Sequence, residues 1–424
     1  MNKKLFKSDI LKEQYTVTTL DNGLKIFIME KQDFDSVYAV FGTKYGSIDN
    51  CFSLNDGEYI SVPNGIAHFL EHKLFESEDG DAFTKYSKTG AYANAFTSFD
   101  KTCYLFSCSS LFDENLDILL NFVQSPYFTA QTVQKEQGII GQEIRMYDDS
   151  PNWCVLFNAL EDMYHNHPVK VDIAGTVESI AEIDDKLLYE CYNTFYNPSN
   201  MFICIAGKVD TDSVIEKITS SIKPSEKIQI NRKKVDEPAS VVKKYIEKNL
   251  EVALPLFCIG YKQILKSEEP SLRESIAVNL LLKLIFGESS PFYKRLTDMG
   301  LINDEFDTEY FTGRGFAAVL LEGESYEPQK VAEEIKKEIS NVLKNGVDTE
   351  LFEAVKRDSF GDTVKRYNSV NNIAMMFIDA AVSYYDIFEE IEILREITLQ
   401  EVLKQLEIFD ETRSVLSVIA PKEK

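Results

Sequence analysis

Alternating apolar and polar residues predict strands in three segments of the first half of the chain. One of them, 15–31, contains an Asn-Gly pair, which is typical of a tight turn between two short strands. The other two are 35–47 and 92–110. Helical spacing of apolar residues predicts helices over 64–89, 112–124, 132–148 and 152–165, and the apolar run 201–209 predicts a buried strand.

The same order begins again in the second half of the chain. An apolar strand is predicted at 254–262 and a long helix at 271–286, followed by further strands and then by helices to the end. The polar, lysine-rich segment 223–240 separates the two patterns. Because 424 residues are too many for one ordinary core, we predict an N-terminal domain, a linker and a C-terminal domain at 1–225, 226–240 and 241–424.

An internal repeat supports this division. A shift of 210 residues without gaps sets 66–90 over 276–300, where Ile, Ala, Leu, Lys, Leu, Glu and Gly coincide. Two helical segments can share apolar residues by chance, but the order of strands and helices repeats as well. The predicted fold class is therefore α+β, with two duplicated α/β-sandwich domains in which a mostly antiparallel sheet packs against helices.

The repeat differs in one respect that points to function. Three polar residues of the first copy, in the segment IAHFLEHKLFE, take the places of three apolar residues in the second copy. They are His68, Glu71 and His72, set over Val278, Leu281 and Leu282. Burying polar groups is costly unless they bind a ligand or form hydrogen bonds. The first copy therefore carries a candidate site, and the second is expected to be a degenerate repeat without it.

The two histidines of this segment are spaced for a shared metal ion. The chain has only four histidines, and His68 and His72 lie four residues apart, on one face of a helix. Two imidazoles so placed can bind one tetrahedral Zn²⁺, and Glu71 lies one position round, suited to activate water beside the metal. The alternative is a structural pair that caps the helix or forms ion pairs.

A catalytic zinc site needs a third protein ligand. The helix predicted at 132–148 contains Glu136 and Glu143, seven residues apart and so on one face. One of them is expected to bind the metal and the other to support a ligand. The alternative is a solvated acidic face. His165 and His167 precede a proline, a spacing that predicts a surface turn, and we do not count them as ligands.

The net charge indicates which partners are disfavoured, and the cysteines indicate the cellular compartment. A net charge of −24 repels phosphate backbones and anionic lipid, which disfavours nucleic acid and membrane as partners. The seven cysteines are scattered without a CxxC pair, as in a reducing cytosol. The lysines near the N-terminus are not followed by an apolar stretch, and no apolar run is long enough to span a bilayer. We expect a cytoplasmic protein.

Several segments resemble the pitrilysin/insulinase family of zinc peptidases, which includes the mitochondrial processing peptidases. The order H-x-x-E-H marks the inverzincins, and GIAHFLEHKLFE looks like the zinc helix of this family. TLDNGLKIFI is similar to its opening strand, GAYANAFTSFDKTCY to the strand after the zinc helix, and EQGIIGQEI to its second metal helix. The resemblance covers nearly the whole chain.

The resemblance implies a zinc endopeptidase that acts on extended peptides, with a role for each matched residue. Glu71 would be the general base, and Glu136 would support the ligands. Asn94 and Ala95 would pair with the substrate backbone at an edge strand, and Phe96 would lie beside the scissile bond. The zinc ligands implied are His68, His72 and Glu143.

The second half departs from the family pattern. Members of the family supply an arginine and a tyrosine from a segment that reads YKRLTDMGLIND here, where Thr297 and Asn303 take those places and Arg295 comes two positions early. The family works as a closed chamber of four such domains, and this chain has two. The resemblance therefore implies the zinc-bearing subunit of a heteromer whose partner supplies the Arg/Tyr pair, with a homodimer as the alternative. A non-catalytic scaffold subunit is the alternative function.

Overall fold

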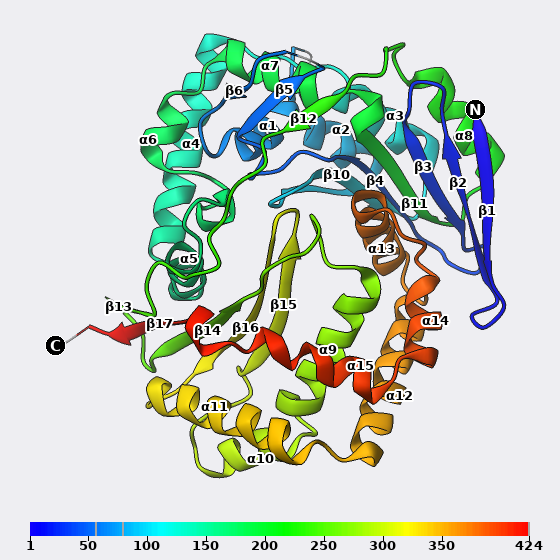
Figure 1. Ribbon diagram of the computed structural model, residues 1–424. Coiled ribbons are helices and arrows are strands. Elements are labelled where there is room, and N and C mark those ends of the chain that lie inside the picture. The colour runs from blue at the N-terminus through cyan, green and yellow to red at the C-terminus, as the bar shows by residue number, and fades with distance from the viewer. Residues whose placement is uncertain (56, 79, 423–424) are drawn as a thin grey trace. The chain divides into compact units, whose positions relative to one another are not determined.

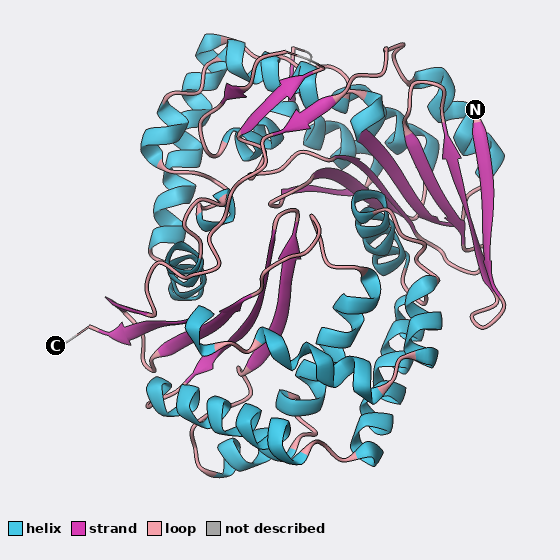
Figure 2. Cartoon of the chain, viewed as in Figure 1, coloured by secondary structure: helices cyan, strands magenta, loops and turns pink. Residues whose placement is uncertain are grey.

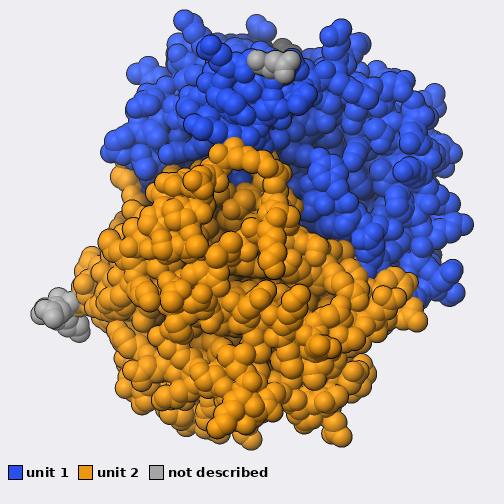
Figure 3. Space-filling view, in the orientation of Figure 1, with its two compact units in different colours: residues 1–144, 172–233, 364–389 blue, residues 145–171, 234–363, 390–424 orange. Residues whose placement is uncertain are grey.

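The computed structural model describes residues 1–55, 57–78 and 80–422, which form two compact units (Figure 3). Unit 1 contains residues 1–144, 172–233 and 364–389, and unit 2 contains 145–171, 234–363 and 390–424. Each unit thus includes a segment from the other half of the sequence. The division of the sequence repeat at 226–240 stays a prediction, because the units group residues by packing and not by repeat.

Unit 1 is built on a seven-stranded sheet (Figure 1). Its spatial order is β1-β2-β3-β11-β4-β10-β9, and only the pair β3 and β11 is parallel. The bounds are β1 Asn2–Ser8, β2 Glu13–Thr19, β3 Lys25–Glu30, β4 Val37–Thr43, β9 Tyr92–Thr97, β10 Thr102–Cys108 and β11 Met201–Gly207. A small sheet adds β5 Cys51–Leu54, β6 Ile60–Ser61 and β12 Ile230–Arg232.

Both faces of this sheet are covered by helices, as Figure 2 shows. Along β3, Ile26 and Ile28 belong to one core cluster and Phe27 and Met29 to another, because successive side chains point to opposite faces. The helices mainly in unit 1 are α1 Ile66–Leu74, α2 Ala82–Thr89, α3 Phe112–Val123, α4 Ala130–Asp148, α6 Val177–Ala181, α7 Asp185–Phe195, α8 Thr211–Ser221 and α13 Val370–Ser383.

The sheet of unit 2 repeats five strands of unit 1 in the same order. It reads β13-β17-β14-β16-β15, with only β13 and β17 parallel, and so matches β3-β11-β4-β10-β9 strand by strand. The bounds are β13 Tyr245–Leu250, β14 Leu256–Lys262, β15 Asp307–Gly313, β16 Phe316–Glu324 and β17 Ser414–Pro421. This match confirms the predicted α+β class with two duplicated sandwiches.

Helices complete the second sandwich. The helix α5 packs against β14 and β17, where Gly260 leaves room for the Met163 side chain. The helices mainly in unit 2 are α5 Pro151–Met163, α9 Leu272–Phe286, α10 Pro291–Asp298, α11 Pro328–Asn345, α12 Thr349–Arg366, α14 Glu389–Glu396 and α15 Leu399–Lys404. Among the described residues, no helix combines the length and apolar character needed to cross a membrane.

Three expectations about local structure were wrong. The predicted helix 64–89 is two helices, α1 and α2, separated by the short strands β7 Glu76–Ser77 and β8 Gly80–Asp81. The last described element is strand β17 instead of a helix. In each repeat the last strand lies between the first two: β11 lies between β3 and β4, and β17 between β13 and β14. His167 is 4% exposed, and its ring accepts a hydrogen bond from the Val169 N–H, so it is buried rather than part of a surface turn.

The packing of α13 on the sheet of unit 1 predicts a stability effect. Phe377 is fully buried, with its ring centroid 5.1 Å from that of Tyr15 and 5.6 Å from that of Phe27. Phe377→Ala is expected to lower the free energy of unfolding by about 3–5 kcal/mol, because it leaves a cavity between helix and sheet. Leu5→Ala is the control, since Leu5 is 54% exposed and its loss should cost under about 0.5 kcal/mol. Calorimetric melting curves that shift equally for the two variants would contradict this packing.

Candidate metal centre

The helix that carries the two histidines starts at a position that only glycine suits. Gly65, just before α1, has φ 88°, in the left-handed region. A Cβ atom there would lie 2.3 Å from the carbonyl oxygen of Ala174. The Gly65 carbonyl accepts a hydrogen bond from the Phe69 N–H, the first bond of the helix. Close contact between this turn and the segment at 174 therefore fixes where α1 begins.

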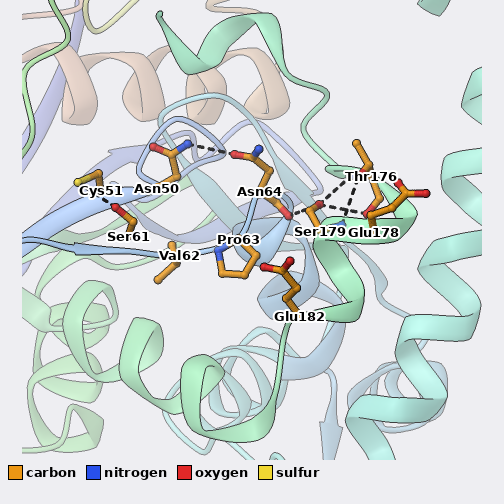
Figure 4. Close-up of a pocket in the computed structure, with 10 residues that line it drawn as sticks. All are labelled: Asn50, Cys51, Ser61, Val62, Pro63, Asn64, Thr176, Glu178, Ser179 and Glu182. Atoms are coloured by element: carbon orange, nitrogen blue, oxygen red, sulfur yellow. Dashed lines mark hydrogen bonds between the residues drawn. The ribbon is translucent and has the colours of Figure 1, made fainter.

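The loop before Gly65 is held by polar contacts, shown in Figure 4. The Asn50 amide donates to Asn64 Oδ1 at 3.0 Å, and the Ser179 hydroxyl donates to the Asn64 carbonyl at 2.9 Å. Thr176 and Ser179 form a capping box at the start of α6. These bonds tie the loop to α6 and leave a polar hollow of about 450 Å³ beside it. The start of α1 is thus braced from two sides.

Three ligand atoms converge between α1 and α4. His68 Nε2 lies 3.7 Å from Glu143 Oε1, and His72 Nε2 lies 3.5 Å from Glu143 Oε2. The atoms that the three residues offer all lie within 4.8 Å of one another, and this is the one such group in the described part of the chain. Ligands about 2.0–2.1 Å from a tetrahedral zinc ion are about 3.3 Å apart, so the spacing suits a single ion.

The protonation of His68 also suits a metal ligand. Its side chain is 12% exposed, and burial together with the neighbouring His72 lowers its pKa to about 3. The ring is therefore neutral near pH 7, and in the tautomer protonated at Nδ1 it offers a lone pair at Nε2. Its Nδ1 is buried without a hydrogen-bond partner among the described residues. A buried polar ring with so few partners is costly by itself, and ligation at Nε2 would offset part of that cost.

The second histidine is oriented by a carboxylate. His72 Nδ1 lies 3.0 Å from Glu136 Oε1, which leaves Nε2 directed toward Glu143. Burial alone would lower the pKa of His72, but the hydrogen bond to Glu136 and the nearby charges of Glu71 and Glu143 outweigh it and raise the pKa. A carboxylate on the far nitrogen of a ligand histidine fixes its tautomer and makes it more basic. Glu136 thus contacts His72 on the nitrogen away from Glu143, and Glu143 is the carboxylate that lies near both histidines.

Glu71 lies beside this group without joining it. Its carboxylate accepts a hydrogen bond from Thr97 Oγ1 at 2.7 Å, and the residue is 9% exposed. Burial raises the pKa of Glu71, which the Thr97 hydroxyl and His72 counteract in part. A carboxyl group with a raised pKa near a metal centre is suited to accept a proton and to release it again.

The edge strand β9 completes the surroundings. It pairs with β10 on one side and has no partner strand on the other among the described residues. Ala95 packs against the core cluster on the α1 side, and Phe96 packs against the cluster that includes α13. The Asn94 side chain accepts a hydrogen bond from the Ala95 N–H at 2.9 Å. The strand that holds Thr97 against Glu71 thus also presents a row of backbone groups.

The structure brings the predicted metal residues together and adds residues that the pattern did not single out. Gly65, Asn64 and Thr97 position α1 and Glu71 but bind no metal themselves. Thr97 lies two residues beyond Ala95, and strand alternation places both on the α1 face of β9, a signal that could have revealed it. The contact of Gly65 with Ala174 joins segments far apart in sequence, and no local pattern indicates it.

Gly65→Ala tests whether the turn positions the ligands. Both the clash with Ala174 and the left-handed φ oppose a side chain, so α1 must shift. We expect the affinity for Zn²⁺ to fall about tenfold or more, as for other loss of ligand support. Gly138→Ala is the matched control, because Gly138 lies in α4 between the two glutamates and a Cβ there meets nothing within 4 Å. Isothermal titration that finds equal affinities for the two variants would contradict this role.

Comparisons with known proteins show the family of the chain. Residues 53–177 match the family model described as "Insulinase (Peptidase family M16)", and residues 182–358 match "Peptidase M16 inactive domain". The chain is 44% identical over 395 residues to the "Uncharacterized zinc protease YmfH" of Bacillus subtilis, covering 90% of this chain and 91% of that protein.

Solved structures extend the match to the fold. The crystal structure of a putative M16-like peptidase from Alicyclobacillus acidocaldarius is 33% identical, with a TM-score of 0.91 over 96% of this chain and 98% of that one. A protease from Helicobacter pylori, 19% identical with a TM-score of 0.85 over 96% of this chain and 100% of that one, shares the fold. With its ligand cluster in the first copy of a duplicated sandwich, the chain belongs to the insulinase family of peptidases, family M16.

Proposed function

We propose that the chain is a zinc-dependent endopeptidase that hydrolyses short or unfolded peptides within a closed chamber. The observation that carries this proposal is the convergence of His68, His72 and Glu143 next to the buried carboxylate of Glu71. Similarity to relatives named zinc proteases supports it. The donor set is complete, which favours an enzyme over the alternative, a scaffold subunit with no need to hold a metal.

His68, His72 and Glu143 would hold the zinc ion, and Glu136 would orient His72. Bound zinc supplies a Lewis acid that polarises the scissile carbonyl and acidifies water. Two imidazole nitrogens and one carboxylate oxygen would form the donor set that is typical of a catalytic zinc site. The hydrogen bond between His72 and Glu136 is the contact most directly concerned with keeping this geometry.

Glu71 would act as general base and then as general acid. It takes a proton from the attacking water and gives that proton to the leaving nitrogen as the peptide bond breaks. The Thr97 hydroxyl holds Oε2, which leaves the other carboxylate oxygen to face the reacting water. Burial raises the pKa of Glu71, which favours its acceptance of a proton from water.

The substrate would add as a strand to the edge of β9. Asn94 and Ala95 would pair with its backbone, and Phe96 would lie beside the bond to be cut. Such pairing requires an extended segment, which a folded protein rarely offers and a short or unfolded peptide does. This supports short or unfolded peptides as the substrate class.

A partner chain would supply the arginine and tyrosine that this chain lacks. Arg295 lies on α10, where its guanidinium is 2.7 Å from Glu338, so its charge is already paired. The Asn303 amide donates to Glu324 at 3.0 Å. These contacts support a heteromer, with a homodimer as the alternative. The seven cysteines are not joined by disulfides in the described residues, which supports the proposed cytoplasmic location, where thiols stay reduced.

Two substitutions separate metal binding from proton transfer. Glu71→Gln should keep one zinc per chain and reduce cleavage of a quenched peptide library at least about 100-fold, because the base is lost. Glu143→Gln should lose the zinc itself. Glu216→Gln on α8, an exposed position, serves as the control. Retained cleavage by the Glu71 variant, measured beside its metal content, would refute the proposed base.

The partner proposal has its own test. The purified, zinc-loaded chain should cleave peptides weakly or not at all, because the groups that stabilise the tetrahedral transition state are missing. Activity should rise about 100-fold or more on adding a family subunit that carries arginine and tyrosine. If the chain alone cleaves at full rate and this depends on Glu71, no partner is needed and the proposal of a heteromer is wrong.

A further inference from the structure

A hollow of about 590 Å³ lies in unit 1 beside the free edge of β9. Side chains of β4, β9 and β10, the residue before β4 and the start of α13 line it. We call it the edge pocket, and its lining is Ser36, Tyr38, Tyr92, Asn94, Ser107 and residues 369–371. None of these residues is charged. Its volume suits a peptide side chain with some water.

Strand register shows which face of the sheet the edge pocket occupies. Tyr92 pairs with Ser107, and Ser107 pairs with Tyr38, so the three side chains form a row on one face. Tyr38 belongs to the cluster that includes α13. The metal ligands and Thr97 lie toward the other face, which α1 covers. The edge pocket is therefore reached along the same edge as the metal centre but from the opposite side of the sheet.

Tyr38 is the feature that points to a ligand. The residue is 7% exposed and lines the pocket, yet its hydroxyl has no hydrogen-bond partner among the described residues. Burial raises its pKa to about 12, so the hydroxyl remains a proton donor at neutral pH. This hydroxyl can therefore donate a hydrogen bond to an acceptor that a ligand brings into the pocket.

The start of α13 adds further donors. Ser369 caps the helix by accepting a hydrogen bond from the Asn372 N–H at 3.3 Å. The N–H groups of Val370 and Asn371 belong to the first turn and have no acceptor within the helix. Together with the helix dipole they favour an oxygen that accepts hydrogen bonds. The lining thus combines hydroxyl and amide donors with no lysine or arginine.

We propose that the edge pocket is a specificity subsite for a substrate side chain with an acceptor oxygen, either a carboxamide or a carboxylate. The proposal rests on the proposed peptidase function. A peptide paired with β9 places alternate side chains on the face of Tyr92 and Asn94. These positions lie two to four residues from Phe96, the residue proposed to lie beside the bond that is cut, or about 7–13 Å along the strand. The recognised residue therefore lies about two to four positions from that bond.

The test compares peptides of one scaffold with Gln, Glu, Leu or Lys at each of the five positions on either side of the cleaved bond. Zinc-loaded enzyme, with its partner if one is required, should prefer Gln or Glu over Leu about tenfold in kcat/KM at one position. Tyr38→Phe removes only the hydroxyl and should reduce that preference about fivefold, with little change for the Leu peptide. Whether Gln or Glu gains more distinguishes amide from acid.

Two controls separate an effect of the pocket from a general effect on the protein or on catalysis. Tyr326→Phe removes a hydroxyl from a residue that is 79% exposed and outside the pocket, and should change nothing. Fluorescence anisotropy of the same peptides with zinc-loaded Glu71→Gln measures their binding in the absence of cleavage. If cleavage depends on Glu71 but neither measurement shows a preference that depends on Tyr38, the edge pocket is not a subsite although the peptidase function stands. If nothing is cleaved but the preference appears in binding, the pocket stands and the catalytic proposal fails.

Discussion

The structure of the site depends on polar side chains placed where a helix would otherwise bury apolar ones. His68, His72 and Glu71 lie on α1, which packs against β9 and β10 within the core of unit 1. Imidazole and carboxylate groups at such positions are stable only with partners. Glu143, Glu136 and Thr97 are those partners, and the three ligand atoms they leave facing one another match the needs of one ion.

The second copy of the fold shows the apolar alternative to these buried polar side chains. In unit 2 the corresponding residues of α9, Val278, Leu281 and Leu282, are at most 2% exposed and form ordinary core. The two sheets share one strand order, so α9 in the second copy can be compared with α1 in the first. The comparison shows that apolar residues fill these positions where the polar triplet is absent. One copy thus keeps apolar residues at these three positions, while the other places there the polar residues of a candidate metal centre.

Much of this could be predicted from the sequence, for identifiable reasons. Histidines four apart and glutamates seven apart lie on single helix faces, so local geometry fixed which side chains could meet. The contact between Gly65 and Ala174, the bond from Thr97 to Glu71 and the place of β17 all join distant segments, which periodicity does not report. The break between α1 and α2 was not predicted, because the apolar spacing continues across it.

The measurement closest to the central claim is zinc K-edge X-ray absorption on the zinc-loaded chain. We expect two imidazole nitrogens at about 2.0–2.1 Å and a carboxylate oxygen at about 2.0–2.2 Å, with no sulfur. Glu71→Gln should leave this coordination intact, and Glu143→Gln should abolish it. A spectrum with sulfur near 2.3 Å, or one that Glu143→Gln leaves unchanged, would contradict the assignment of the metal centre to α1 and α4.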